Sequence, residues 1–155
     1  MAIQDYIDRL VGLQGFYVIK LRFHEDLSTL WIEVSRREKE YRCTCGRTYR
    51  SCYDSRLRSV RDLSFGPFGR VWIEFSQCRI RCATCGVRTE YLDWVEPRVG
   101  YTKRLAGAVA LACREIRSIK AIAQQFRLHW SVVKQIDKKA LQDGLPAVGD
   151  TEATL

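Results

Sequence analysis

Closely spaced cysteines are the feature of this sequence that most constrains its fold. The run from Cys82 to Gly86 reads C-A-T-C-G, a spacing in which a turn points two thiolates at one ion and the glycine frees backbone N–H groups for the sulfurs. Upstream, the run from Cys43 to Gly46 reads C-T-C-G and has one residue fewer between the cysteines. Four thiolates close a tetrahedral shell, so we predict a structural zinc ion, Zn2+.

The four expected ligands are the cysteines of these two pairs, and Cys52 is the reserve in case the tight first spacing keeps Cys43 away from the ion. Cys78 is a weaker candidate because it lies on the strand that leads into Cys82. Cys113 belongs to an apolar helix and is expected to be a small core residue. A set of free thiols is the alternative to a metal. The predicted ligand set is Cys43, Cys45, Cys82 and Cys85.

The cysteine count and the net charge limit the classes of protein to which this chain can belong. Seven cysteines, in close pairs and behind no export signal, favour metal binding in a reducing compartment over disulfides. The net charge of +8 favours a polyanionic partner, nucleic acid ahead of an anionic membrane, although a solvated basic surface has the same charge. No apolar run approaches the roughly 18 residues of a membrane span. We therefore expect a cytoplasmic, nucleoid-associated protein with no membrane partner.

The first two thirds of the chain have the pattern of a small β-rich module. A module below ~70 residues usually needs a staple such as a metal. Helical spacing predicts a short helix over 5–13, and β-rich runs predict a hairpin from 16–23 and 30–34. Alternation over 69–82 predicts a third strand that leads into the second cysteine pair. The metal ligands would then lie at strand ends.

The last third of the chain has the pattern of helices. A proline and a glycine within 93–101 break the preceding pattern. Thr102 is a good N-cap for a helix that runs through Arg114, and two more helices are predicted over 118–126 and 130–141. The predicted fold class is α+β. The expected domains are an N-terminal helix, β-hairpin and zinc-binding module at 1–96, an all-α helix-turn-helix module at 97–142, and a loose tail at 143–155.

The last two predicted helices fit a helix-turn-helix. Their apolar residues fall at the spacing by which two short helices bury a shared face across a tight turn, with Ala123 where the helices cross. Arg127 holds the turn position usually given to glycine, at a cost of ~1 kcal/mol if its backbone is left-handed. An ordinary helical hairpin is the alternative. The shared face consists of Ile122, Ala123, Phe126, Leu128, Val133 and Ile136.

The second of these helices turns polar side chains outward. A glutamine can pair with adenine, a lysine can reach guanine, and a serine can bond a base or a phosphate, so this face is predicted to read DNA. His129 and Trp130 at its start either support the turn or touch the DNA backbone, and Trp130 is equally compatible with a cap on the helical core. The predicted DNA contacts of this helix are Ser131, Lys134, Gln135 and Lys138.

A basic stretch surrounds the first cysteine pair. Between Arg36 and Arg61, nine basic residues stand against three acidic ones, and three tyrosines interleave with them. This combination suits phosphate contacts and sugar packing, and the preference for arginine suits planar bidentate phosphate recognition. A solvated charged face is the alternative. The predicted phosphate contacts are Arg36, Arg37, Lys39, Arg42, Arg47, Arg50, Arg56, Arg58 and Arg61.

The parts follow one another in a specific order, which consists of the run from Leu10 to Leu13, the Val18 hairpin, the two cysteine pairs with the run from Ser59 to Leu63 between them, and the helix-turn-helix. This order resembles the N-terminal half of the ISL3 family of bacterial insertion-sequence transposases. The resemblance covers roughly residues 6–142. It implies a zinc-binding domain and a helix-turn-helix that bind the terminal inverted repeats of the element. In the family these precede a DDE catalytic domain that cuts DNA with divalent metal ions.

The chain departs from the family in two respects. The first cysteine pair is C-x-C where the family has C-x2-C, which leaves one ligand open. The sequence also stops at Leu155, and the run from Val148 to Asp150 resembles only the start of the first catalytic strand. One carboxylate without the other two cannot hold a two-metal site, so the tail would begin a missing catalytic domain and we expect no strand cleavage from this polypeptide.

These patterns favour a double-stranded DNA-binding protein of transposase origin, not itself an enzyme, with zinc as a structural ion. Its expected protein partners are a second copy or a full-length transposase. One alternative is a stand-alone regulator that competes with a full transposase for its DNA ends. Two alternatives from other classes are a small iron-cysteine electron-transfer protein, which visible colour would reveal, and a protein-interaction module whose helices dimerise.

Overall fold

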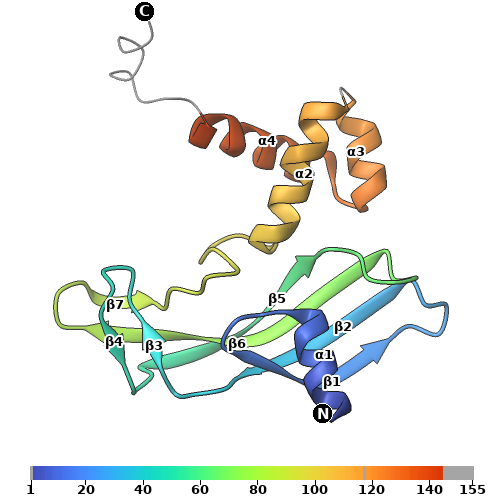
Figure 1. The fold of residues 1–155 in the computed structure, drawn as a ribbon. Helices are drawn as coiled ribbons and strands as arrows, with labels where there is room; N and C mark the ends of the chain where they lie inside the picture. Colours follow the sequence, from blue (N-terminus) through green and yellow to red (C-terminus); the bar gives the residue numbers. More distant parts are fainter. Residues whose placement is uncertain (1, 117, 145–155) are drawn as a thin grey trace, which may run out of the picture. The chain divides into compact units, whose positions relative to one another are not determined.

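The computed structural model describes residues 2–116 and 118–144, and the chain forms two compact units, Met1–Leu105 and Ala106–Leu155 (Figure 1). The first unit is a sheet with one helix, and the second consists of helices. The fold class is therefore α+β, as the sequence predicts. No helix among the described residues is long and apolar enough to cross a membrane.

A five-stranded sheet forms the first unit, in the order β1-β2-β6-β5 with β7 paired to β6. The β2–β6 pair is parallel and the other pairs are antiparallel. The strands predicted over 16–23, 30–34 and 69–82 are confirmed. The strand bounds are Phe16–Phe23 for β1, Thr29–Arg36 for β2, Asp54–Asp62 for β5, Arg70–Cys82 for β6 and Gly86–Thr89 for β7.

Strand β5 was not expected from the sequence. It lies within the basic stretch, and most of its first six residues are exposed, so it lacks the apolar alternation by which a strand is recognised. It forms because it pairs antiparallel with β6 along its whole length, from Asp54 opposite Arg79 to Asp62 opposite Val71. The basic stretch is consequently a sheet edge strand in its second half and not a loop.

The core of the first unit follows the predicted alternation. Val71, Ile73 and Phe75 of β6 are buried, and each such side chain contributes about 1.5–3 kcal/mol to folding. The ring of Phe75 meets the edge of Trp94 with centroids 4.7 Å apart, and Phe16 meets Trp94 at 5.4 Å. Helix α1, Ile3–Val11, packs partly buried side chains against this core.

The segment that follows β7 packs on the sheet although it has little regular structure. Trp94 and Val95 belong to the core, and an isolated bridge joins Arg61 to Tyr101. Asp62 accepts hydrogen bonds from the Thr102 hydroxyl at 2.8 Å and from Nε of Arg104 at 2.8 Å. The break in the sequence pattern over 93–101 is therefore a change of secondary structure within the first unit, which extends to Leu105.

The cysteine-rich end of the first unit has a separate small core. Two short strands, β3 (Tyr41–Arg42) and β4 (Thr48–Tyr49), form a two-stranded sheet there. Buried Ile80 of β6 packs with Tyr41 and with the cysteines. This end buries few apolar side chains, which is the situation in which small modules depend on a bound metal.

The predicted helices of the last third are confirmed as α2 (Lys103–Glu115), α3 (Ile119–Phe126) and α4 (Trp130–Gly144). The Thr102 hydroxyl accepts a hydrogen bond from Leu105 N–H at 3.3 Å, as an N-cap does, and Ser118 accepts from Ala121 N–H at 3.2 Å. The loose tail expected over 143–155 lies outside the described residues from 145 onward.

Candidate metal centre and nucleic-acid interface

The two cysteine pairs converge on one point. The Sγ atoms of Cys43, Cys45, Cys82 and Cys85 all lie within 4.8 Å of one another, and those of Cys45 and Cys82 are 3.7 Å apart. A zinc ion with sulfurs at 2.3 Å has tetrahedral edges of about 3.8 Å. The donor set and its spacing therefore fit a metal ion held by four thiolates.

Local backbone geometry explains how both pairs reach this point. Gly46 and Gly86 have φ values of 94° and 77°, a region that glycine adopts without strain. Gly46 N–H donates to the Cys43 carbonyl at 2.9 Å, and Cys43 N–H donates to the Arg47 carbonyl at 2.8 Å. This tight turn delivers both sulfurs although only Thr44 separates the cysteines.

Hydrogen bonds shift the pKa values of the clustered thiols. The Tyr49 hydroxyl donates to Cys82 Sγ at 3.1 Å and accepts from Ala83 N–H at 3.0 Å. Together with N–H groups of the second knuckle, Tyr49 lowers the pKa of Cys82 to about 6. Hydrogen bonds to the neighbouring Cys43 and Cys45 thiols raise the pKa of Cys85 to about 12.

Tyr49 is the residue of this site that sequence reasoning placed elsewhere. It is one of the three tyrosines of the basic stretch, which the sequence suggested for packing against DNA sugars, whereas its hydroxyl donates a hydrogen bond to a sulfur atom of the cluster. Groups that hold metal ligands in place contribute to metal affinity as well. The only signal in the sequence is its position four residues after Cys45, on the strand that closes the first turn.

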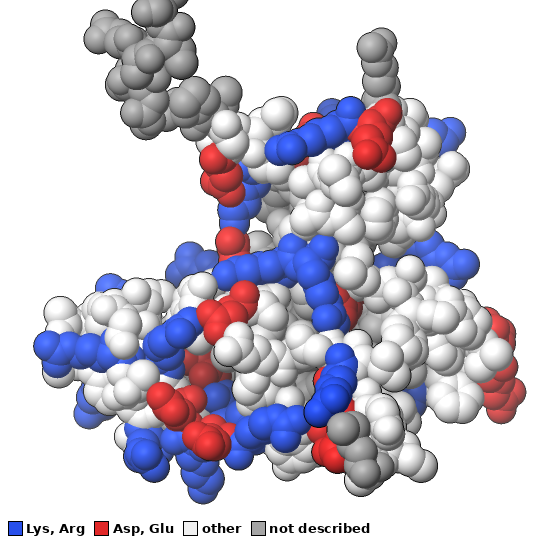
Figure 2. All heavy atoms as spheres, viewed as in Figure 1, with Lys and Arg blue, Asp and Glu red and all other residues white. Residues whose placement is uncertain are grey.

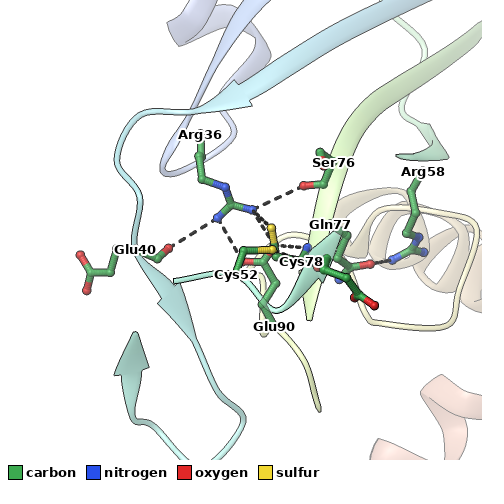
Figure 3. Close-up of polar contacts among 9 residues, drawn as sticks. Arg36, Glu40, Cys52, Arg58, Ser76, Gln77, Cys78 and Glu90 are labelled. Atoms are coloured by element: carbon green, nitrogen blue, oxygen red, sulfur yellow. Dashed lines mark hydrogen bonds and ion pairs between the residues drawn. The ribbon is translucent and has the colours of Figure 1, made fainter. Parts of the chain in front are cut away.

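The other cysteines lie outside the cluster. Cys52 donates from Sγ to the Asp54 carbonyl at 2.9 Å. Cys78 is buried beside Cys52, and burial with this neighbour raises its pKa to about 12 (Figure 3). Cys113 is half-buried on α2. The structure thus gathers the predicted first-choice set and leaves the reserve cysteine apart.

The nine basic residues of the predicted phosphate-contacting stretch divide by exposure. Arg36 is held by Glu90, with Nη2 and Oε1 2.5 Å apart and the carboxylate 1% exposed. Arg58 is half-buried, and Arg61 is buried over the Trp72 ring. Arg42 is exposed but paired with Asp93 at 2.6 Å. The exposed members are Arg37, Lys39, Arg42, Arg47, Arg50 and Arg56.

Figure 2 shows blue Lys and Arg side chains gathered over the part of the first unit that carries β3, β4 and β7. Acidic side chains are interspersed among them, since Asp54 and Asp93 pair with arginines of this end. Arg47 in the β3–β4 turn and Arg50 directly after β4 are both exposed. This surface can make phosphate contacts without reading bases.

The helix-turn-helix has the expected geometry. Ile122 and Ala123 of α3 are buried, as are Val133 and Ile136 of α4. Arg127 adopts the left-handed conformation, with φ 52° and ψ 47°, and ends α3. The side chains predicted to contact DNA, Ser131, Lys134, Gln135 and Lys138, are all exposed.

The start of α4 is organised by His129. Its Nδ1 lies 2.6 Å from the Ser131 hydroxyl and accepts from Ser131 N–H at 3.3 Å, so His129 supports the turn. Trp130 is 53% exposed, and Lys134 Nζ lies 5.2 Å from its ring centroid. Trp130 therefore stands on the outer surface of α4 next to a predicted DNA contact and does not close the helical core.

Comparison with known proteins gives two matches to transposases. Residues 90–141 match the helix-turn-helix domain of transposase family ISL3. The chain is also 32% identical over 148 residues to the transposase for insertion sequence element IS1001 of Bordetella parapertussis, an alignment that covers 92% of this chain and 35% of that protein. No solved structure matches the chain significantly. The chain thus spans about a third of its relative's length, and its residues 90–141 are similar to the helix-turn-helix domain of transposase family ISL3.

Proposed function

We propose that this protein binds a specific double-stranded DNA site through helix α4. The observation that carries the proposal is the division of α4 into a buried face and an exposed face with four polar side chains, Ser131, Lys134, Gln135 and Lys138. Gln135 can pair with adenine in two hydrogen bonds, and Lys134 can reach guanine. Trp130 and Lys138 flank these readers along the same helix.

The exposed arginines of the first unit contribute affinity without specificity. They neutralise backbone phosphates, which releases counterions and makes binding depend steeply on salt. Arg36 and Arg61 are engaged inside the protein and are assigned structural roles, so these two residues leave the phosphate-contacting set. The first unit then contributes to binding of any duplex, and α4 selects the site.

Zinc is the metal proposed for the four-cysteine cluster. Four thiolates leave no open coordination position, so its role is structural. Iron would also accept four thiolates, and it would give the protein a visible colour. Elemental analysis of the purified protein distinguishes the two ions.

We further propose that the DNA target is the terminal inverted repeat of an insertion sequence. The support is the similarity to an insertion-sequence transposase, of which this chain matches only a third. Strand cleavage is not assigned to residues 2–144, where the chemistry of the exposed groups is that of DNA recognition. A second copy or a full-length transposase is the expected protein partner at the paired ends of the element.

The test is selection of bound fragments from a random DNA pool, followed by titration of Gln135→Ala against the selected and a scrambled duplex. Loss of a bidentate base contact should cost about 1–3 kcal/mol on the selected duplex and little on the scrambled one. Lys39→Ala is the matched control, because it removes an exposed phosphate contact and should weaken both duplexes equally. Equal losses on both duplexes for Gln135→Ala would refute α4 as the reader.

A further inference from the structure

A polar groove of about 600 Å³ lies along β5 and β6 of the first unit, bordered by residues 97–100. Four arginines line it, and Asp54 is the one carboxylate in its lining. Asp54 binds one of these arginines, with its Oδ1 2.7 Å from Nε of Arg79. The groove therefore keeps a surplus of positive charge. Its arginines are Arg56, Arg58, Arg79 and Arg98.

Gln77 places an unsatisfied donor in the wall of this groove. The residue is 5% exposed, and its Oε1 accepts a hydrogen bond from Nη1 of Arg58 at 2.5 Å. Its Nε2 has no hydrogen-bond partner among the residues that the structure describes. A buried donor without a partner costs about 1–3 kcal/mol, so this position favours an acceptor supplied from outside.

Arg58 is a half-buried cation held by neutral oxygens. Its Nη2 donates to the Val99 carbonyl at 2.5 Å, its Nη1 bonds Gln77, and the ion pairs of the described residues do not include it. Burial lowers the pKa of Arg58, because a desolvated charge lacks compensation. An anion at this position would restore that compensation.

Arg36 differs from Arg58 because it has a charged partner. Arg36 donates a hydrogen bond to the carboxylate of Glu90, and this charge neutralises the Arg36 guanidinium (Figure 3). The same carboxylate accepts the N–H of Cys78, which follows Gln77 on β6. Gln77 takes the equivalent place for Arg58 but carries no charge. The fold thus neutralises one half-buried arginine internally and leaves the other available to an external anion.

We propose that this groove binds a phosphate group of the DNA backbone, with Arg58 and Nε2 of Gln77 as donors inside it and Arg56 and Arg98 at its exposed border. Phosphate suits the site because it offers several acceptor oxygens to planar guanidinium groups. The proposal rests on DNA binding as the function of the chain. It adds Gln77 and Arg98, which lie outside the basic stretch recognised in the sequence.

The decisive variant is Gln77→Glu, which keeps the side-chain shape, removes the donor and gives Arg58 an internal carboxylate. We expect zinc content and folding to be retained while affinity for selected and scrambled duplexes falls about tenfold, as loss of a charged hydrogen bond would produce. Arg98→Gln acts at an exposed position where folding is insensitive. It should weaken both duplexes and reduce the slope of log affinity against log salt by about 0.9.

Arg70→Gln is the matched control, since it removes an exposed arginine from the same strand, about 23 Å from Gln77 along β6. Its affinity should equal that of the wild type. Wild-type affinity in both Gln77→Glu and Arg98→Gln would overturn the groove while leaving DNA binding by α4 intact. Failure of the wild-type protein to bind any duplex at low salt would overturn the groove and the proposed function together.

A direct readout is the side-chain amide signal of Gln77 in a 15N–1H spectrum. Added duplex should shift this signal in the wild type and in Arg70→Gln, and the shift should be reduced in Arg98→Gln. Inorganic phosphate is titrated separately to distinguish a free ion from a DNA phosphate. Saturation by phosphate with no response to duplex would mean that the groove takes a small anion, and the proposal as stated would be wrong.

Discussion

Single residues decide which cysteines form the candidate metal site. The four clustered Sγ atoms lie within 4.8 Å of one another, while the Cys52 thiol is turned toward the Asp54 carbonyl. From the sequence, Cys52 remained a possible substitute for Cys43. The reason is that in an extended backbone a C-x-C pair is too short to bring both sulfurs to one ion. The positive φ of Gly46 provides the turn that makes this reach sufficient.

We predict one zinc ion per wild-type chain, retained in Cys52→Ser and lost in Cys45→Ser. The second change removes one of four ligands and opens the shell, and the first removes a thiol that lies outside it. Elemental analysis after gel filtration measures both. Loss of zinc from Cys52→Ser would transfer the ligand role to Cys52.

At the scale of elements, the turn between α3 and α4 stores strain. Arg127 has φ 52°, where a side chain with a Cβ atom costs roughly 1 kcal/mol relative to glycine. The turn is nevertheless well bonded, since Arg127 and Leu128 donate their N–H groups to Gln124 and Ala123 carbonyls. Backbone conformation, and not missing hydrogen bonds, is therefore the source of strain.

Arg127→Gly should raise the free energy of unfolding of the second unit by about 1 kcal/mol, because glycine adopts this conformation without strain. Chemical denaturation followed by circular dichroism measures the change. Gly107→Ala on α2 is the comparison, since it raises helix propensity and leaves the turn untouched. A fall in stability for Arg127→Gly would show that the arginine side chain contributes more than its backbone costs.

The junction of α1 with β1 depends on one carboxylate. Asp8 accepts the Val18 N–H at 2.8 Å, and this bond, with Gln4 and Arg37, holds the pKa of Asp8 below its usual value of 3.8. A carboxyl whose pKa is lowered by folding stabilises the protein above its unfolded pKa, and this stability is lost as the pH falls through the folded pKa.

Asp8→Asn should therefore reduce stability at pH 7, and the difference from wild type should shrink as the pH falls below the usual pKa of 3.8 and through the lowered pKa of Asp8. Urea unfolding at several pH values measures it. Glu25→Gln, in the exposed β1–β2 loop, is the control and should differ little from wild type at any pH. A deficit for Asp8→Asn that is independent of pH would exclude ionisation of Asp8 as the cause.

At the scale of the whole molecule, the two units depend on different sources of stability. The first has a sheet core and a separate cysteine-rich core of few apolar residues, and the second relies on helix packing around Ile122 and Val133. Among the described residues, the cysteine cluster that could hold a metal lies in the first unit. Loss of a bound metal should thus lower the stability of the first unit and leave that of the second unchanged.

Removal of zinc by a strong chelator should lower the melting temperature of the first unit by roughly 10 °C or more and leave the amide signals of α3 and α4 in place. Thermal scans with backbone amide spectra of the same sample measure both effects. Readdition of zinc should restore the first unit. Simultaneous loss of the α3 and α4 signals would show that the second unit needs the metal as well.

Local patterns in the sequence determined the helices of the second unit, three of the strands and the two cysteine pairs, because periodicity, caps and knuckle spacing depend on neighbours in the chain. Tertiary structure decided the rest. Strand β5 exists because β6 pairs with it, and residues 93–101 join the first core although their local pattern is broken. Burial also divided the basic residues: Glu90 neutralises Arg36, whereas Arg58 meets the neutral oxygens of Gln77 and Val99. This difference depends on contacts between distant segments, and a count of charges does not reveal it.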